Sequence, residues 1–127
     1  MPKAFTLIEL LIVIALLGIL SSIGVVTFTG HIASSHKKKA EVTINSIYLA
    51  QSEYQSNNSE YCINSCNSTS TIVNNLLDGV DNLSDQKYNF TISGNTSNQT
   101  YTIQARHKTS SCTLTLTHKS VKGESGC

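Results

Sequence analysis

Charge, proline and tryptophan are scarce in this chain of 127 residues: 13% of residues are charged, one is Pro and none is Trp. The charged share is about half of that in an ordinary globular domain. The formal net charge is +1, so no global field favours nucleic acid or an acidic partner. The sequence also has no glycine-rich phosphate loop, no paired catalytic carboxylates and no Ser/His/Asp arrangement. These absences argue against an enzyme, and the length allows one small domain.

The missing charge is concentrated in one place, since no charged residue occurs between Leu10 and Gly30. Residues 5–28 are apolar on all sides except at Glu9, and they are long enough to cross a hydrocarbon core of about 30 Å. A carboxylate in lipid is costly unless it is paired or protonated. A cleaved secretory signal and a plain membrane anchor are two interpretations of this segment, and neither explains Glu9.

A third interpretation rests on the string Ala4-Phe5-Thr6-Leu7-Ile8-Glu9, which runs into uninterrupted apolar residues. This string resembles the processing site of type IV prepilins and pseudopilins. The resemblance implies that a prepilin peptidase removes residues 1–4, cleaves between Ala4 and Phe5, and methylates the new amine of Phe5.

Four further positions bear on this resemblance. Gly18 matches a helix-loosening glycine of the family, and Gly24 is a second weak point, each costing about 1 kcal/mol of helix stability relative to Ala. The family usually has Gly where this chain has Ala4, which keeps the small size that cleavage needs. The family's helix-kinking Pro falls at Val26, so no Pro kink is predicted.

Glu9 has a physical role in this interpretation. It follows Phe5 by four residues, so the two lie on one helix face. When subunits stack, the N-terminal amine of one subunit can reach the glutamate of a neighbour and pair two charges that would otherwise be buried alone. The hypothesis is that Glu9 sets the axial register between subunits.

The resemblance implies a bacterial subunit that is single-pass in the inner membrane before assembly and extracellular in a fibre afterwards. Its implied partners are further copies and other pilins, the prepilin peptidase and methylase, and an inner-membrane assembly platform. One feature opposes this topology. The run His36–Lys39 follows the apolar segment, where the positive-inside rule would place it in the cytoplasm. The resemblance and the cysteines place it outside.

The apolar segment continues into an amphipathic one, because no proline or glycine interrupts residues 31–57. The spacing predicts one helix over about residues 5–57, whose second half buries the stripe Ala33, Ala40, Ile44, Ile47, Gln51 and Tyr54. A short helix is expected near residues 70–77.

Apolar residues then alternate at period two in three segments, which predicts strands with one buried face. The inward residues are Tyr88, Phe90 and Ile92; Tyr101, Ile103 and Ala105; and Cys112, Leu114 and Leu116. The predicted fold is therefore α+β and pilin-like: the long helix, with an apolar first half and an amphipathic second half, packs on a three- to four-stranded antiparallel sheet. The expected parts are the leader (1–4), the membrane-spanning and fibre-core half of the helix (5–30), and a head (31–127) divided into the amphipathic half (31–57), a variable loop (58–86), the sheet (87–118) and a C-terminal cysteine loop (119–127).

Four cysteines allow three pairings. We expect Cys62–Cys66 and Cys112–Cys127, the second because pilins often carry a disulfide that closes a C-terminal loop. A bridge from Cys66 to Cys112 or Cys127 is the alternative. A metal site that adds His107 or His118 matches no zinc spacing, so neither a metal nor a cofactor is expected. A catalytic Cys62 or Cys112 would require a thiol.

Basic residues supply the remaining candidate site. Arg106, Lys108, Lys119 and Lys122 lie near predicted strand ends and are candidate DNA or anion contacts, although no aromatic residues are interleaved with them. The sequence and the resemblance together predict a structural type IV pilus subunit that supports adhesion, twitching motility or DNA uptake. The alternatives are a minor pilin acting as a DNA receptor and a type II secretion pseudopilin.

Overall fold

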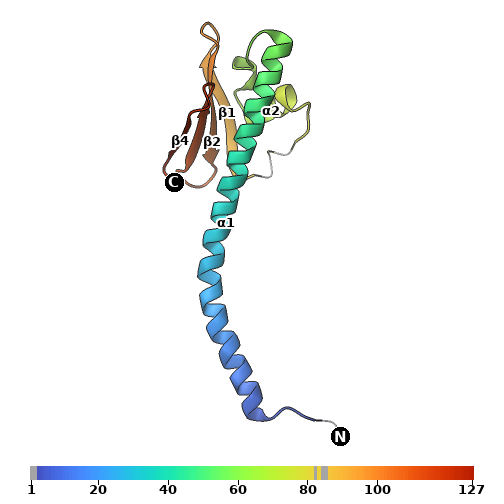
Figure 1. Ribbon diagram of the computed structural model, residues 1–127, viewed down its shortest axis with the longest axis vertical. Coiled ribbons are helices and arrows are strands. Elements are labelled where there is room, and N and C mark those ends of the chain that lie inside the picture. Colours follow the sequence, from blue (N-terminus) through green and yellow to red (C-terminus); the bar gives the residue numbers. More distant parts are fainter. Residues whose placement is uncertain (1–2, 82, 84–85) are drawn as a thin grey trace. The chain divides into compact units, whose positions relative to one another are not determined.

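The computed structural model describes residues 3–81, 83 and 86–127; Met1 and Pro2 of the predicted leader lie outside them. The chain divides into two compact units, Met1–Ser35 and His36–Cys127. We call the second unit the head. Helix α1, Leu7–Asn58, runs through both (Figure 1). It begins two residues after the predicted start, because Thr6 caps it, and it includes Gly18 and Gly24.

The head follows the predicted α+β plan. After α1 come a short 3-10 helix η1, Asn64–Cys66, and helix α2, Thr69–Leu76. Four antiparallel strands form one sheet in the order β1-β2-β3-β4. Their bounds are Tyr88–Asn95, Thr100–His107, Thr113–Thr117 and Lys122–Ser125.

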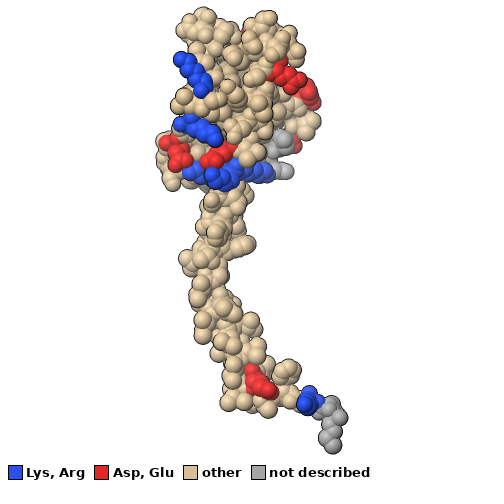
Figure 2. Space-filling view, in the orientation of Figure 1, with Lys and Arg blue, Asp and Glu red and all other residues tan. Residues whose placement is uncertain are grey.

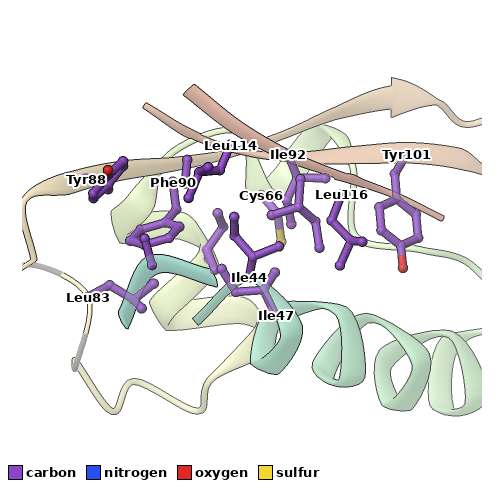
Figure 3. Packing of buried hydrophobic residues seen from close by; sticks show 14 of the residues in the cluster. Ile44, Ile47, Cys66, Leu83, Tyr88, Phe90, Ile92, Tyr101, Leu114 and Leu116 are labelled. Atoms are coloured by element: carbon purple, nitrogen blue, oxygen red, sulfur yellow. The ribbon is translucent and has the colours of Figure 1, made fainter. Parts of the chain in front are cut away.

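The core lies between α1 and one face of the sheet (Figure 3). Each strand from β1 to β3 buries the alternate residues that the period-two pattern predicts, and Cys112 is buried just before β3. The α1 stripe needs correction: Ala33 is exposed and Tyr54 is half-buried, whereas Thr43 is buried. Burial on α1 begins at Ala40, and Ala33 precedes the head.

Strand β4 occupies the segment that was expected to be a C-terminal cysteine loop. Its register pairs Leu114 with Glu124 and Thr113 with Ser125. All four of its residues are exposed, so it lacks the alternation by which the other strands are recognised. A Cβ at position 123 would lie 2.6 Å from the Oγ1 atom of Thr115, so a larger residue there would require that side chain to shift.

Candidate functional site

The apolar half of α1 is the first candidate site. Every large apolar side chain from Leu7 to Phe28 is 48–76% exposed, and Phe5 is 86% exposed. Among the described residues, one helix, α1, is long enough and apolar enough to span a membrane, judged by length and composition. A surface of this size and polarity is stable in lipid or against other apolar helices, and not in water.

Glu9 helps to cap the N-terminus of this helix, a role that the sequence analysis does not predict. Its Oε2 atom accepts the backbone N–H of Thr6 at 2.8 Å and the hydroxyl of Thr6 at 2.9 Å. In return, the N–H of Glu9 donates to Oγ1 of Thr6 at 3.3 Å. This reciprocal pair is a capping box, and the spacing Thr-x-x-Glu ahead of an apolar run is the signal that could have revealed it.

The two glycines predicted to loosen the helix, Gly18 and Gly24, are not required by packing within the chain. A Cβ at either position would meet nothing within 4 Å. Any requirement for glycine there therefore comes from helix flexibility or from neighbouring molecules.

In the head, the structure confirms both predicted disulfides, Cys62–Cys66 and Cys112–Cys127. All four cysteines are thus paired, which overturns the alternatives that require a thiol or a bridge from Cys66 to the C-terminal pair. The first disulfide is buried, at 2% and 0% exposure, in the core beneath the loop that follows α1. The second ties the end of the chain to the start of β3.

Two buried side-chain amides hold the connecting loop to α1. The side chain of Gln51 donates to the carbonyl of Cys62 at 2.6 Å and accepts its N–H at 2.9 Å. At the other end of the loop, Gln86 and Thr43 bond through their side chains at 2.8 Å. The helical spacing predicts that Gln51 is buried, but it gives no sign of these hydrogen bonds.

The predicted basic surface is divided in two. Arg106 and Lys108 lie at the end of β2, where β1 begins. Lys119 and Lys122 follow the end of β3, and the β2–β3 register places that end beside Thr102, four residues from Arg106 along β2. Because successive antiparallel strands run in opposite directions, these two pairs lie toward opposite ends of the sheet.

Other cations join Arg106 and Lys108 instead. The backbone N–H of Lys108 donates to the carbonyl of Lys87 at 3.0 Å. Nζ of Lys37 lies 2.7 Å from Oε2 of Glu124 on β4, and this hydrogen bond raises the pKa of Lys37. Lys38 forms a second ion pair, with Glu41, at 3.3 Å. In Figure 2, basic side chains gather along the end of the head at which α1 enters it, and others lie apart from them.

The loop after β2 is held by His107. Nδ1 of His107 accepts the backbone N–H groups of Thr109 at 3.2 Å and Ser110 at 3.0 Å. Its ring packs edge-on against that of Tyr88, with the ring centroids 4.9 Å apart. His107 thereby fixes the course of the chain on both sides of Lys108.

An exposed apolar helix half, continuing into an amphipathic half that packs on an antiparallel sheet with a disulfide at its C-terminus, defines the class of type IV pilins. The chain belongs to the family of type IV minor pilins described as ComP, DNA uptake sequence receptor, which it matches over residues 27–117. Residues 2–25 match the prokaryotic N-terminal methylation motif.

A curated relative agrees with this assignment. The type IV major pilin protein PilA of Myxococcus xanthus (strain DK1622) is 37% identical over 59 residues, which are 46% of this chain and 27% of that protein. The match therefore spans about a quarter of the relative's length. No solved structure matches the chain.

Proposed function

We propose that the chain is a subunit of a type IV pilus. It is anchored in the inner membrane by residues 5–30, cleaved between Ala4 and Phe5, methylated at Phe5, and polymerised through its apolar helix into an extracellular fibre with other pilins. The observation that carries this proposal is the exposed apolar half of α1, which coincides with the N-terminal methylation motif. The prepilin peptidase and the inner-membrane assembly platform are the other partners it requires.

The test of processing is mass spectrometry of subunits from sheared fibres. We expect a chain that begins at N-methyl-Phe5, and an assembled subunit that still carries Met1 would overturn the proposal. The Glu9 register hypothesis has its own test. Glu9→Ala should abolish assembly, whereas Glu53→Ala, an exposed glutamate on the same helix, should assemble normally. Wild-type levels of fibre from Glu9→Ala would contradict the register role.

We infer as a second candidate that the subunit binds DNA during uptake. The family description supports this role, since it covers most of the head, and it favours a pilus over a type II secretion pseudopilin. The two separated basic pairs, Arg106 with Lys108 and Lys119 with Lys122, give the test a natural comparison within one molecule.

The experiment measures duplex DNA binding by the full chain in neutral lipid nanodiscs at several salt concentrations. Neutralising the pair that contacts phosphates should weaken binding and reduce the slope of log affinity against log salt by about 2, one counterion per lost contact. The other pair, changed to Gln in the same way, should leave the slope intact. DNA binding that neither change affects would refute a role for these residues.

A further inference from the structure

Six cations belong to segments that meet at the end of the head where α1 enters it. We call them the basal cluster: Lys37, Lys38, Lys39, Lys87, Arg106 and Lys108. The links that bring them together are the Lys108–Lys87 backbone hydrogen bond, the β1–β2 register beside it, and the ion pair that joins Lys37 to β4. The basal cluster therefore draws on α1, the start of β1 and the end of β2, which are far apart in sequence.

The described acids that lie near the basal cluster are fewer than its cations. Glu124 pairs with Lys37 and Glu41 with Lys38, and Asp81 lines the same groove as Lys108. Within the part of the chain that the structure describes, three carboxylates thus face six cations. Lys39, Lys87 and Arg106 are exposed to solvent. Counted over the described residues, cations outnumber acids here, although the whole chain carries only +1.

The lysines that α1 contributes to the basal cluster follow closely, in sequence, on the apolar segment that would anchor the chain. Phe28 ends the apolar run, and Lys37 follows nine residues later on the same helix. At 1.5 Å per residue, about 14 Å of helix separates Lys37 from the end of the apolar segment. An anionic lipid surface attracts cations over about a Debye length, which is about 8 Å at physiological salt. Long lysine side chains bridge the remaining distance.

We propose that the basal cluster docks the head on anionic phospholipid headgroups before assembly. This proposal rests on the membrane-anchored stage of the proposed function. Five of the six cations are lysines, whose compact charge suits phosphate groups in a fluid surface, and no base-stacking aromatic side chain is needed. It also gives a use to the Lys37–Lys39 run, which the positive-inside rule would have placed on the other side of the membrane.

The test is lysine footprinting of the full chain in nanodiscs. An amine-reactive reagent labels the protein in phosphatidylcholine discs and in discs of phosphatidylcholine mixed with phosphatidylglycerol, and mass spectrometry gives the labelling rate of each lysine. Lys39, Lys87 and Lys108 should react about threefold more slowly in the anionic discs, because the surface potential enriches protons by about that factor. Lys119 and Lys122, at the far end of β3, should react equally in both.

Salt and matched variants complete the design. At about 1 M salt, where the Debye length is about 3 Å, the difference should vanish. Lys39→Gln with Lys87→Gln should restore fast labelling of Lys108, whereas Lys119→Gln with Lys122→Gln should not. All four lysines are exposed, so both double variants keep the core intact.

Three results would overturn the proposal. Equal labelling of the basal lysines in both discs, from a chain that still assembles into fibres, refutes lipid docking and leaves the pilus proposal standing. Protection of the same lysines by duplex DNA in neutral discs, without any effect of phosphatidylglycerol, assigns the basal cluster to nucleic acid. A chain that does not enter nanodiscs at all refutes both proposals.

Discussion

The buried amide of Gln51 gives the sharpest prediction about the head. Gln51 is 0% exposed and holds the backbone of Cys62, which is 2% exposed, by hydrogen bonds at 2.6 and 2.9 Å. In Gln51→Leu, the N–H and the carbonyl of Cys62 both lose their partner inside the core. The substitution therefore separates hydrogen bonding from apolar burial, since leucine fills much of the same space.

The size of the loss follows from those two groups. Each buried backbone group left without a partner costs about 1–3 kcal/mol. The leucine side chain returns about 1–2 kcal/mol through apolar burial. The net destabilisation is about 0–5 kcal/mol with a central value of about 2.5 kcal/mol, and that central value lowers Tm by roughly 10–20 °C in a unit of this size.

The assay uses the tyrosines, because all five lie in the head and none in the apolar half of α1. Near-ultraviolet circular dichroism of the full chain in micelles therefore reports melting of the head alone. The matched control is Gln55→Leu, the same chemical change one turn later on an exposed position of α1. If Gln51→Leu and Gln55→Leu have the same Tm, the hydrogen bonds between Gln51 and Cys62 do not stabilise the loop and the reasoning fails.

Three further predictions follow from the same structure. Cys112→Ser with Cys127→Ser opens a loop with a sequence separation of 15 and should lower the free energy of unfolding in urea by about 3 kcal/mol; an unchanged urea midpoint would contradict this. Burial raises the pKa of Tyr101, so the head should keep its stability below about pH 10 and lose it as pH rises further; Tyr101→Phe should shift the alkaline midpoint upward, and Tyr54→Phe should not. Thr6→Val removes the cap of α1 and should speed amide exchange at Glu9, whereas Thr27→Val, in the same apolar segment, should leave that rate unchanged.

Much of this fold could be predicted from the sequence, because most of it depends on patterns that a sequence displays. The alternation around Phe90, Ile103 and Leu114 fixed the inward face of three strands, and all three residues are buried. Strand β4 has no such pattern. It is held in place by the Cys112–Cys127 disulfide and by main-chain pairing with β3, and main-chain hydrogen bonds leave no mark on side-chain type.

The candidate sites were predictable to different degrees. The apolar helix and its Glu9 are local features, and local features can be read directly. The basic surface depends on topology, because Arg106 ends β2 and Lys119 follows β3, and only the antiparallel order shows that they lie at opposite ends. Lys37 and Lys87 belong to the basal cluster because of contacts between segments that are distant in sequence, and the sequence carries no signal for such contacts.

The capping box changes how the Glu9 hypothesis should be tested. Both hydrogen bonds from Thr6 end on Oε2 of Glu9, and among the described residues none uses Oε1. One oxygen thus closes the first turn of the helix while the other can accept an amine from a neighbouring subunit, so the two roles do not compete. Loss of assembly in Glu9→Ala alone would not tell them apart, because that change removes both. Thr6→Val removes the cap and keeps the carboxylate. Fibres from Thr6→Val together with none from Glu9→Ala would therefore attribute assembly to the pairing between subunits, and loss of fibres in both would attribute it to the cap.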